Sequence, residues 1–200
     1  MDECCKVVTI SEQQRRVFLA VLWINMGMFV LEAWAGILAH STALLADSVD
    51  MLGDAIVYGF SLYVIGRGAL WEARAALLKG AIMAAFGVGV LAHVIFKAVY
   101  GIVPTAEVMG VVGTIALAAN LLCLMLLWQR RGDDLNMRSS WVCSRNDVIG
   151  NVGVLFAALA VYFTGSPWPD IAVGLMIATL FVRSAIAIIR EASRALISSN

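Results

Sequence analysis

Long apolar stretches alternate with short polar segments along the whole chain. Each stretch is about 20 residues long, the length that an α-helix needs to cross the hydrocarbon core of a bilayer. The pattern predicts six membrane-spanning helices, at 17–38, 43–66, 76–99, 107–129, 139–163 and 170–189. We therefore expect an all-α, polytopic membrane protein built as a six-helix bundle.

The composition agrees with this prediction. Hydrophobic residues make up 62% of the 200 residues and charged residues only 14%, whereas soluble proteins have about 25% charged residues. The 14 basic and 14 acidic residues balance, so nothing favours nucleic acid as a partner. The lipid bilayer is the expected environment.

The basic residues predict how the chain is oriented. Nearly all of them fall on one side of the six spans, and Lys97 stands apart on the other side. By the positive-inside rule both termini are then cytoplasmic. We expect a tail at 1–16, a transmembrane domain at 17–190, and a short tail at 191–200 with no further cytoplasmic domain. The polar start of the chain predicts no cleavable signal peptide.

Three carboxylates share one face of the predicted span at 43–66. Asp47, Asp50 and Asp54 are spaced i, i+3, i+7, which places them on one side of a helix. Charged residues inside a membrane are costly, at roughly 2.5–3.5 kcal/mol each near the helix centre. Such a stripe indicates a function, although a single buried Asp also serves to lock neighbouring helices together.

A second polar stripe lies on the span at 139–163. Its members are Cys143, Asn146, Asp147 and Asn151, again at helical spacing. Each asparagine alone is as compatible with helix packing as with function, and Cys143 alone would resemble a small buried hydrophobe. The position of Cys143 one turn before Asp147 is what favours a pair of ligands.

The two stripes are predicted to meet near the middle of the membrane. Antiparallel packing would bring Asp50, Asp54, Cys143 and Asp147 together as three carboxylates and one thiol. A divalent metal relieves their repulsion, and a sulfur ligand argues for Zn²⁺-like ions rather than Mg²⁺ or Ca²⁺. Because the ligands must lose protons to bind metal, proton exchange is a natural coupling.

At these residues the chain resembles the cation diffusion facilitator family of divalent-metal transporters. The segments that carry the resemblance are "NMGMFVLEAWAGILAHSTALLADSVDMLGD" and "TGSPWPDIAVGLMIATLFVRSAIAIIREASRALI". The family places metal-binding pairs at the positions of Asp50 and Asp54 and of Cys143 and Asp147. The resemblance implies a secondary transporter, not an enzyme, that exports metal and holds no prosthetic group.

Two departures from the family pattern bear on selectivity and assembly. Zinc-transporting members carry His where this chain has Cys143, so the resemblance implies Zn²⁺ or Cd²⁺, and Co²⁺ after them, with Asn146 as an alternative ligand. The loop between the fourth and fifth predicted spans contains no histidine, and we expect no cytoplasmic domain of the kind that most family members carry. We expect a minimal member that forms homodimers through its membrane helices, in a bacterial inner membrane.

Acidic residues toward the opposite side predict a release path. Glu32, Asp47 and His40 could line such a path, or Glu32 and Asp47 could hydrogen-bond neighbouring helix ends. Two functions of other classes also stay open: a proton-coupled exporter of organic cations, and a membrane scaffold subunit without transport.

The four cysteines predict no disulfide framework. Cys4 and Cys5 are adjacent, and Cys123 and Cys143 lie at membrane depth, where pairing is disfavoured. Cys4 and Cys5 could capture soft metal at the cytoplasmic entrance, or they could be incidental members of a flexible tail.

Overall fold

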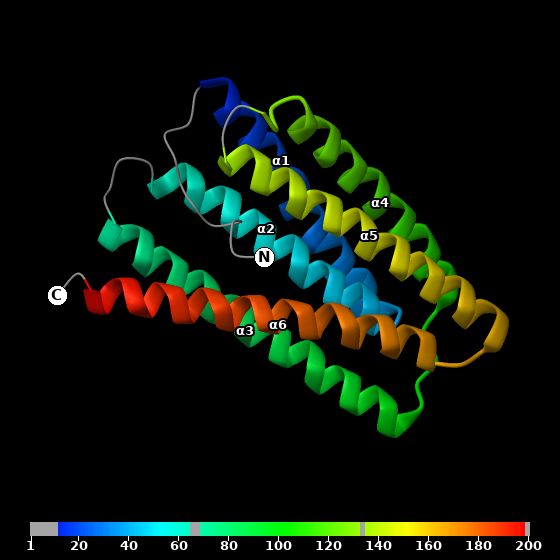
Figure 1. Cartoon of the computed structure of the whole chain (residues 1–200). Helices are drawn as coiled ribbons and strands as arrows, with labels where there is room; N and C mark the ends of the chain where they lie inside the picture. The colour runs from blue at the N-terminus through cyan, green and yellow to red at the C-terminus, as the bar shows by residue number, and fades with distance from the viewer. Residues whose placement is uncertain (1–11, 65–68, 133–134, 199–200) are drawn as a thin grey trace.

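The chain folds into a bundle of six α-helices (Figure 1). The computed structural model describes residues 12–64, 69–132 and 135–198, and this part contains helices and no strand. The helices are α1 (Glu12–Leu38), α2 (Thr42–Val64), α3 (Ala69–Tyr100), α4 (Ala106–Trp128), α5 (Leu135–Thr164) and α6 (Trp168–Ser198). The predicted all-α bundle of six helices is confirmed.

Several helices continue beyond the predicted apolar spans. Helix α3 begins at Ala69 instead of at 76, and α6 runs to Ser198 instead of ending at 189. These extensions consist mainly of good helix formers such as Ala, Leu, Glu and Arg. The helical hydrogen bonds therefore continue where the apolar pattern, which reports only the membrane-buried section, has ended.

Helix α2 is the central element of the bundle. By length and composition, five of the described helices could cross a membrane, namely α1 and α3 to α6. Helix α2 differs because it carries three aspartates. It packs against α1, α3, α5 and α6 (Figure 1), so protein and not lipid covers most of this polar helix.

One end of the bundle holds the short turns that join α1 to α2, α3 to α4, and α5 to α6; we call it the turn end. Here the buried carboxylate of Asp170, in the first turn of α6, accepts hydrogen bonds from Ser41 Oγ (2.6 Å), Thr42 N (2.7 Å) and Ala43 N (3.1 Å). It also forms a salt bridge of 2.6 Å with Lys97 Nζ, and both side chains are almost completely buried. Asp170 therefore ties together the start of α2, the end of α3 and the start of α6.

This arrangement explains the lone basic residue on the far side of the predicted topology. Lys97 is not a loop residue: it lies within α3 and is 1% exposed. Close packing supports the same junction, because a Cβ atom added at Gly174 would lie 2.7 Å from Thr42 Cγ2. Only a residue without a side chain lets α6 approach α2 so closely.

Candidate metal centre

Two carboxyl groups from α2 and α5 meet in the interior of the bundle. Asp54 and Asp147 are hydrogen-bonded to each other, and Tyr58, one turn after Asp54 on α2, donates its hydroxyl to Asp54 Oδ2 over 3.3 Å. Tyr58 is 1% exposed and Asp147 8%. Because a carboxylate only accepts hydrogen bonds, two carboxyls can bond to each other only while one of them carries a proton.

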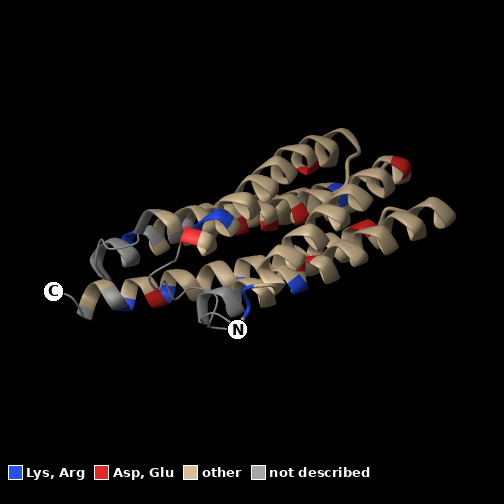
Figure 2. Ribbon diagram, turned by 90° about the horizontal axis from the view of Figure 1, so that it is seen from above, with Lys and Arg blue, Asp and Glu red and all other residues tan. Residues whose placement is uncertain are grey.

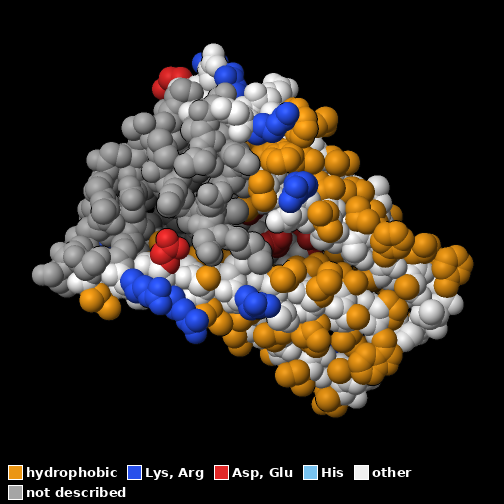
Figure 3. Space-filling model, in the orientation of Figure 1, with side chains coloured by type: hydrophobic (Ala, Val, Ile, Leu, Met, Phe, Trp, Pro, Cys, Tyr) orange, Lys and Arg blue, Asp and Glu red, His pale blue; other side chains and the backbone are white. Residues whose placement is uncertain are grey.

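Asp50 lies about one turn before Asp54 on α2, near the pair of Asp54 and Asp147. It interacts electrostatically with Asp147 and with Asp47, and like Asp54 it is partly exposed. Figure 2 shows acidic positions midway along the bundle, and Figure 3 shows acidic atoms at the bottom of a hollow, with basic and apolar side chains around it. Asp50 and Asp54 are therefore less completely enclosed by the bundle than Asp147.

The structure does not assemble a complete set of metal ligands. Within residues 12–64, 69–132 and 135–198, no three His, Cys, Asp or Glu side chains are arranged to hold a metal ion. Three of the four predicted ligands come near one another, namely Asp50, Asp54 and Asp147. A metal would have to draw them closer.

Cys143 differs from the prediction. It is disulfide-bonded, so the expectation of no disulfide framework is wrong for this cysteine. A disulfide sulfur is not a thiolate and does not serve as a metal ligand. Asn146, the alternative ligand, is exposed. Cys4 and Cys5 lie outside the described residues.

A second group of polar side chains lies one helical turn from Asp50, toward the turn end. Asn151 donates its Nδ2 hydrogens to Asp47 Oδ1 (3.2 Å) and to the backbone oxygen of Asp147 (3.1 Å). Asp47 is thus bonded to a side chain of α5 and not to a helix end. Glu32 on α1 is 0% exposed, and neither of its oxygens has a hydrogen-bond partner in the described part of the chain.

His40 lies apart from this group, in the turn between α1 and α2. Its side chain is exposed, its φ is 52°, and its backbone oxygen accepts a hydrogen bond from Lys97. The described hydrogen bond of His40 is therefore made by its backbone and not by its imidazole ring.

Two further residues, Tyr58 and Cys123, lie near Asp54 and Asp147 and were not predicted from the sequence. Cys123 on α4 is a free thiol, 1% exposed, that packs beside Tyr58 and interacts electrostatically with Asp54 and Asp147. Asn25 Nδ2 lies 3.8 Å from its sulfur. The spacing of Tyr58 four residues after Asp54 was the one available signal, because i and i+4 share a helix face.

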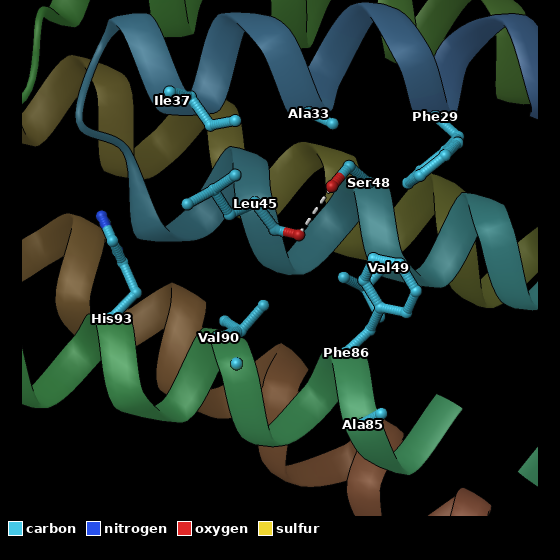
Figure 4. A pocket seen from close by; sticks show the side chains of 11 residues that line it. Phe29, Ala33, Ile37, Leu45, Ser48, Val49, Ala85, Phe86, Val90 and His93 are labelled. Carbon is cyan, nitrogen blue, oxygen red and sulfur yellow. Dashed lines mark hydrogen bonds between the residues drawn. The ribbon is translucent and has the colours of Figure 1, made fainter. Parts of the chain in front are cut away.

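An apolar groove lies elsewhere, between α1, α2 and α3. Its volume is about 410 Å³, and Phe29 and Phe86 meet edge to face across it with ring centroids 6.3 Å apart. Figure 4 shows His93 on α3 and Ser48 on α2 among its otherwise apolar lining. No acidic residue lines this groove, so it is distinct from the carboxyl cluster.

Comparison with known proteins gives one family. The profile described as the cation efflux transmembrane domain matches residues 18–197. The metal cation efflux system protein CzcD of Cupriavidus metallidurans is 25% identical over 180 residues, covering 84% of this chain and 56% of that protein.

Two further relatives have similar sequence identities and coverages. The cadmium, cobalt and zinc/H(+)-K(+) antiporter of Bacillus velezensis is 27% identical, covering 85% of this chain and 59% of its own length. The zinc transporter ZitB of Yersinia pestis is 27% identical, with 81% and 56% covered. The chain thus spans less than two thirds of the length of these relatives.

Proposed function

Because the chain belongs to the cation efflux family, whose relatives are membrane transporters and not enzymes, we propose that it exports a soft divalent metal cation from the cytoplasm in exchange for protons. Zn²⁺ and Cd²⁺ are the first candidates, and Co²⁺ follows. The expected family resemblance is confirmed by the match over residues 18–197. The relatives are bacterial, which places this integral membrane protein in a bacterial plasma membrane.

The observation that carries the proposal is the contact between Asp54 on α2 and the buried Asp147 on α5. They lie on two antiparallel helices of an apolar bundle, and a hydrogen bond between them requires one proton. A divalent cation bound between them would replace that proton, so metal binding and proton release become one exchange. Asp50, which interacts electrostatically with Asp147, is the proposed third oxygen ligand.

Cys143 completes the proposed ligand set once its disulfide is reduced. The thiolate is the form that binds metal, and the cytoplasm keeps thiols reduced. A sulfur ligand beside three carboxylates favours Zn²⁺ and Cd²⁺ over Mg²⁺ and Ca²⁺. The names of the relatives, which include zinc, cadmium and cobalt, support the same class of cargo.

Export requires that the site binds metal more tightly when it faces the cytoplasm than when it faces outward. A cation with equal affinity for both states would shift no population between them. After release from Asp50 and Asp54, the cation would pass the layer of Asp47 and Asn151 on its way to the turn end. We propose that the functional unit is a homodimer joined through membrane helices.

Metal flux into proteoliposomes tests the proposal. Asp54→Asn and Asp147→Asn keep the size of each side chain but remove its charge, and each is expected to abolish uptake of Zn²⁺ and Cd²⁺. Glu107→Gln, at an exposed position in the first turn of α4, is the matched control and should transport like wild type. Wild-type flux in either aspartate variant would overturn the assignment of the site.

Proton exchange and cargo class need two further measurements. A pH-sensitive dye inside the vesicles should report protons moving against the metal, and a silent dye would reject antiport. Calorimetry separates the competing function, because an exporter of organic cations would bind lipophilic cations and ignore Zn²⁺.

A further inference from the structure

Glu32 lies completely inside the bundle and lacks a hydrogen-bond partner. It is 0% exposed, and both carboxylate oxygens are unpartnered among the described residues. A buried carboxylate without donors loses its hydration and gains nothing in return. Such a group is stable in its ionised form only when a cation joins it. Neither the Asp54–Asp147 pair nor its proposed chemistry uses Glu32.

The hairpin of α1 and α2 brings Asp47 to the same level. At about 1.5 Å per residue, Glu32 lies about 9 Å before the end of α1 at Leu38, and Asp47 about 8 Å after the start of α2 at Thr42. The two helices pack closely against each other, and the two carboxyls interact electrostatically. Two carboxyl groups therefore interact in an apolar interior.

Asn151 adds a third group from α5. Its amide nitrogen holds Asp47 Oδ1 at 3.2 Å, while its own Oδ1 and Asp47 Oδ2 have no partner in the part of the chain that the structure describes. Asp47 is 1% exposed and Asn151 0%. Together with the two oxygens of Glu32, three helices thus contribute four buried oxygens that lack a donor.

We infer that Glu32, Asp47 and Asn151 form a second cation site, which binds a divalent metal through oxygen atoms alone. A divalent cation would neutralise both carboxylates. Oxygen-only ligands suit harder ions such as Mn²⁺ and Co²⁺ better than Cd²⁺, which prefers sulfur. The site lies one turn from Asp50 toward the turn end. This inference rests on the proposed function in one respect, namely that metal ions must reach the interior of the bundle.

Co²⁺ binding to the purified full chain, with its thiols reduced, tests this site. Bound Co²⁺ is counted by equilibrium dialysis, and a near-ultraviolet charge-transfer band reports sulfur ligation. Glu32→Gln is expected to lose about one bound Co²⁺ per chain and to keep the sulfur band, because only oxygen ligands are removed. Glu107→Gln is the matched control and keeps both signals.

The same titration separates this site from the transport site. Asp54→Asn should lose or weaken the sulfur band yet keep the Co²⁺ that depends on Glu32. If Asp54→Asn keeps the sulfur band, the transport-site assignment fails, whatever Glu32→Gln shows. If Glu32→Gln binds as much Co²⁺ as wild type, the second site is overturned. If Glu32→Gln takes up fewer protons than wild type but binds as much Co²⁺, the second site is overturned equally, since Glu32 and Asp47 would then bind a proton and not a metal ion.

Thermal unfolding distinguishes a metal site from a structural role. Without metal, Glu32→Gln should melt at a higher temperature than wild type, because it removes an unpaired buried carboxylate. Co²⁺ should then raise the melting temperature of wild type more than that of the variant. A lower melting temperature with unchanged Co²⁺ binding would mean that Glu32 only supports the fold. Asn151→Leu is the second variant, and it too should lose the Co²⁺.

Discussion

Replacing Asp170 by leucine is expected to destabilise the protein far more than replacing its salt-bridge partner Lys97 by methionine. Asp170 accepts four hydrogen bonds, from Ser41, Thr42, Ala43 and Lys97. Without Asp170, Lys97 becomes an unpaired buried cation, and the two backbone N–H groups that begin α2 lose their acceptor. Without Lys97, the carboxylate of Asp170 keeps three of its four donors.

The magnitudes follow from this count. Breaking a buried ion pair by removing one partner costs about 3–5 kcal/mol, and each orphaned backbone N–H adds about 1–3 kcal/mol. Asp170→Leu combines both costs, because it strands Lys97 and the amides of Thr42 and Ala43. Lys97→Met breaks the same ion pair and so also costs about 3–5 kcal/mol, but it leaves Asp170 its three other donors and orphans no backbone N–H group.

Thermal unfolding in detergent, followed by circular dichroism, measures the difference. A change of 1 kcal/mol shifts the melting temperature by about 2–4 °C for a chain of this size. The double variant Lys97→Met with Asp170→Leu should be more stable than Asp170→Leu alone, since it no longer buries an unpaired cation. Equal losses in the two single variants, or simple additivity in the double variant, would refute the reasoning.

Two other predictions concern packing and sulfur ligation. Gly174→Ala should destabilise the protein by about 1–3 kcal/mol, because its Cβ would lie 2.7 Å from Thr42, whereas Gly110→Ala, with open space around it, should be nearly neutral in the same melting assay. Cys143→His should shift transport from Cd²⁺ toward Zn²⁺ in competition assays, and Cys123→Ser should leave the cobalt–sulfur band intact. Loss of the band in Cys123→Ser would move the sulfur ligand to that residue.

The pattern of apolar residues predicted the number and class of the helices correctly. Twenty-residue apolar runs permit little else, because a backbone inside a bilayer must satisfy its own hydrogen bonds. The helix ends were less predictable. Helix α3 begins at Ala69 and α6 ends at Ser198. Polar residues that favour helix formation continue both helices outside the membrane, and a hydropathy pattern does not register this continuation.

The spacing of polar residues predicted which side chains share a face, but not which contacts they make. Asp50 and Asp54 were correctly placed on one face of α2, because spacing within a helix is a local property. The pairing of Asp54 with Asp147 and the link from Asn151 to Asp47 depend on how α2 packs against α5. The full ligand set around Cys143 remains a prediction.

The sequence by itself therefore determined the membrane class, the six helices and the polar faces, because each follows from local composition and helical period. Only the tertiary structure decided that Lys97 pairs with Asp170, that Glu32 is buried without a partner, and that Cys123 lies near the carboxyl pair. These residues come from different helices, far apart along the chain. Their contacts depend on the rotation and register of each helix against its neighbours, which no single helix specifies.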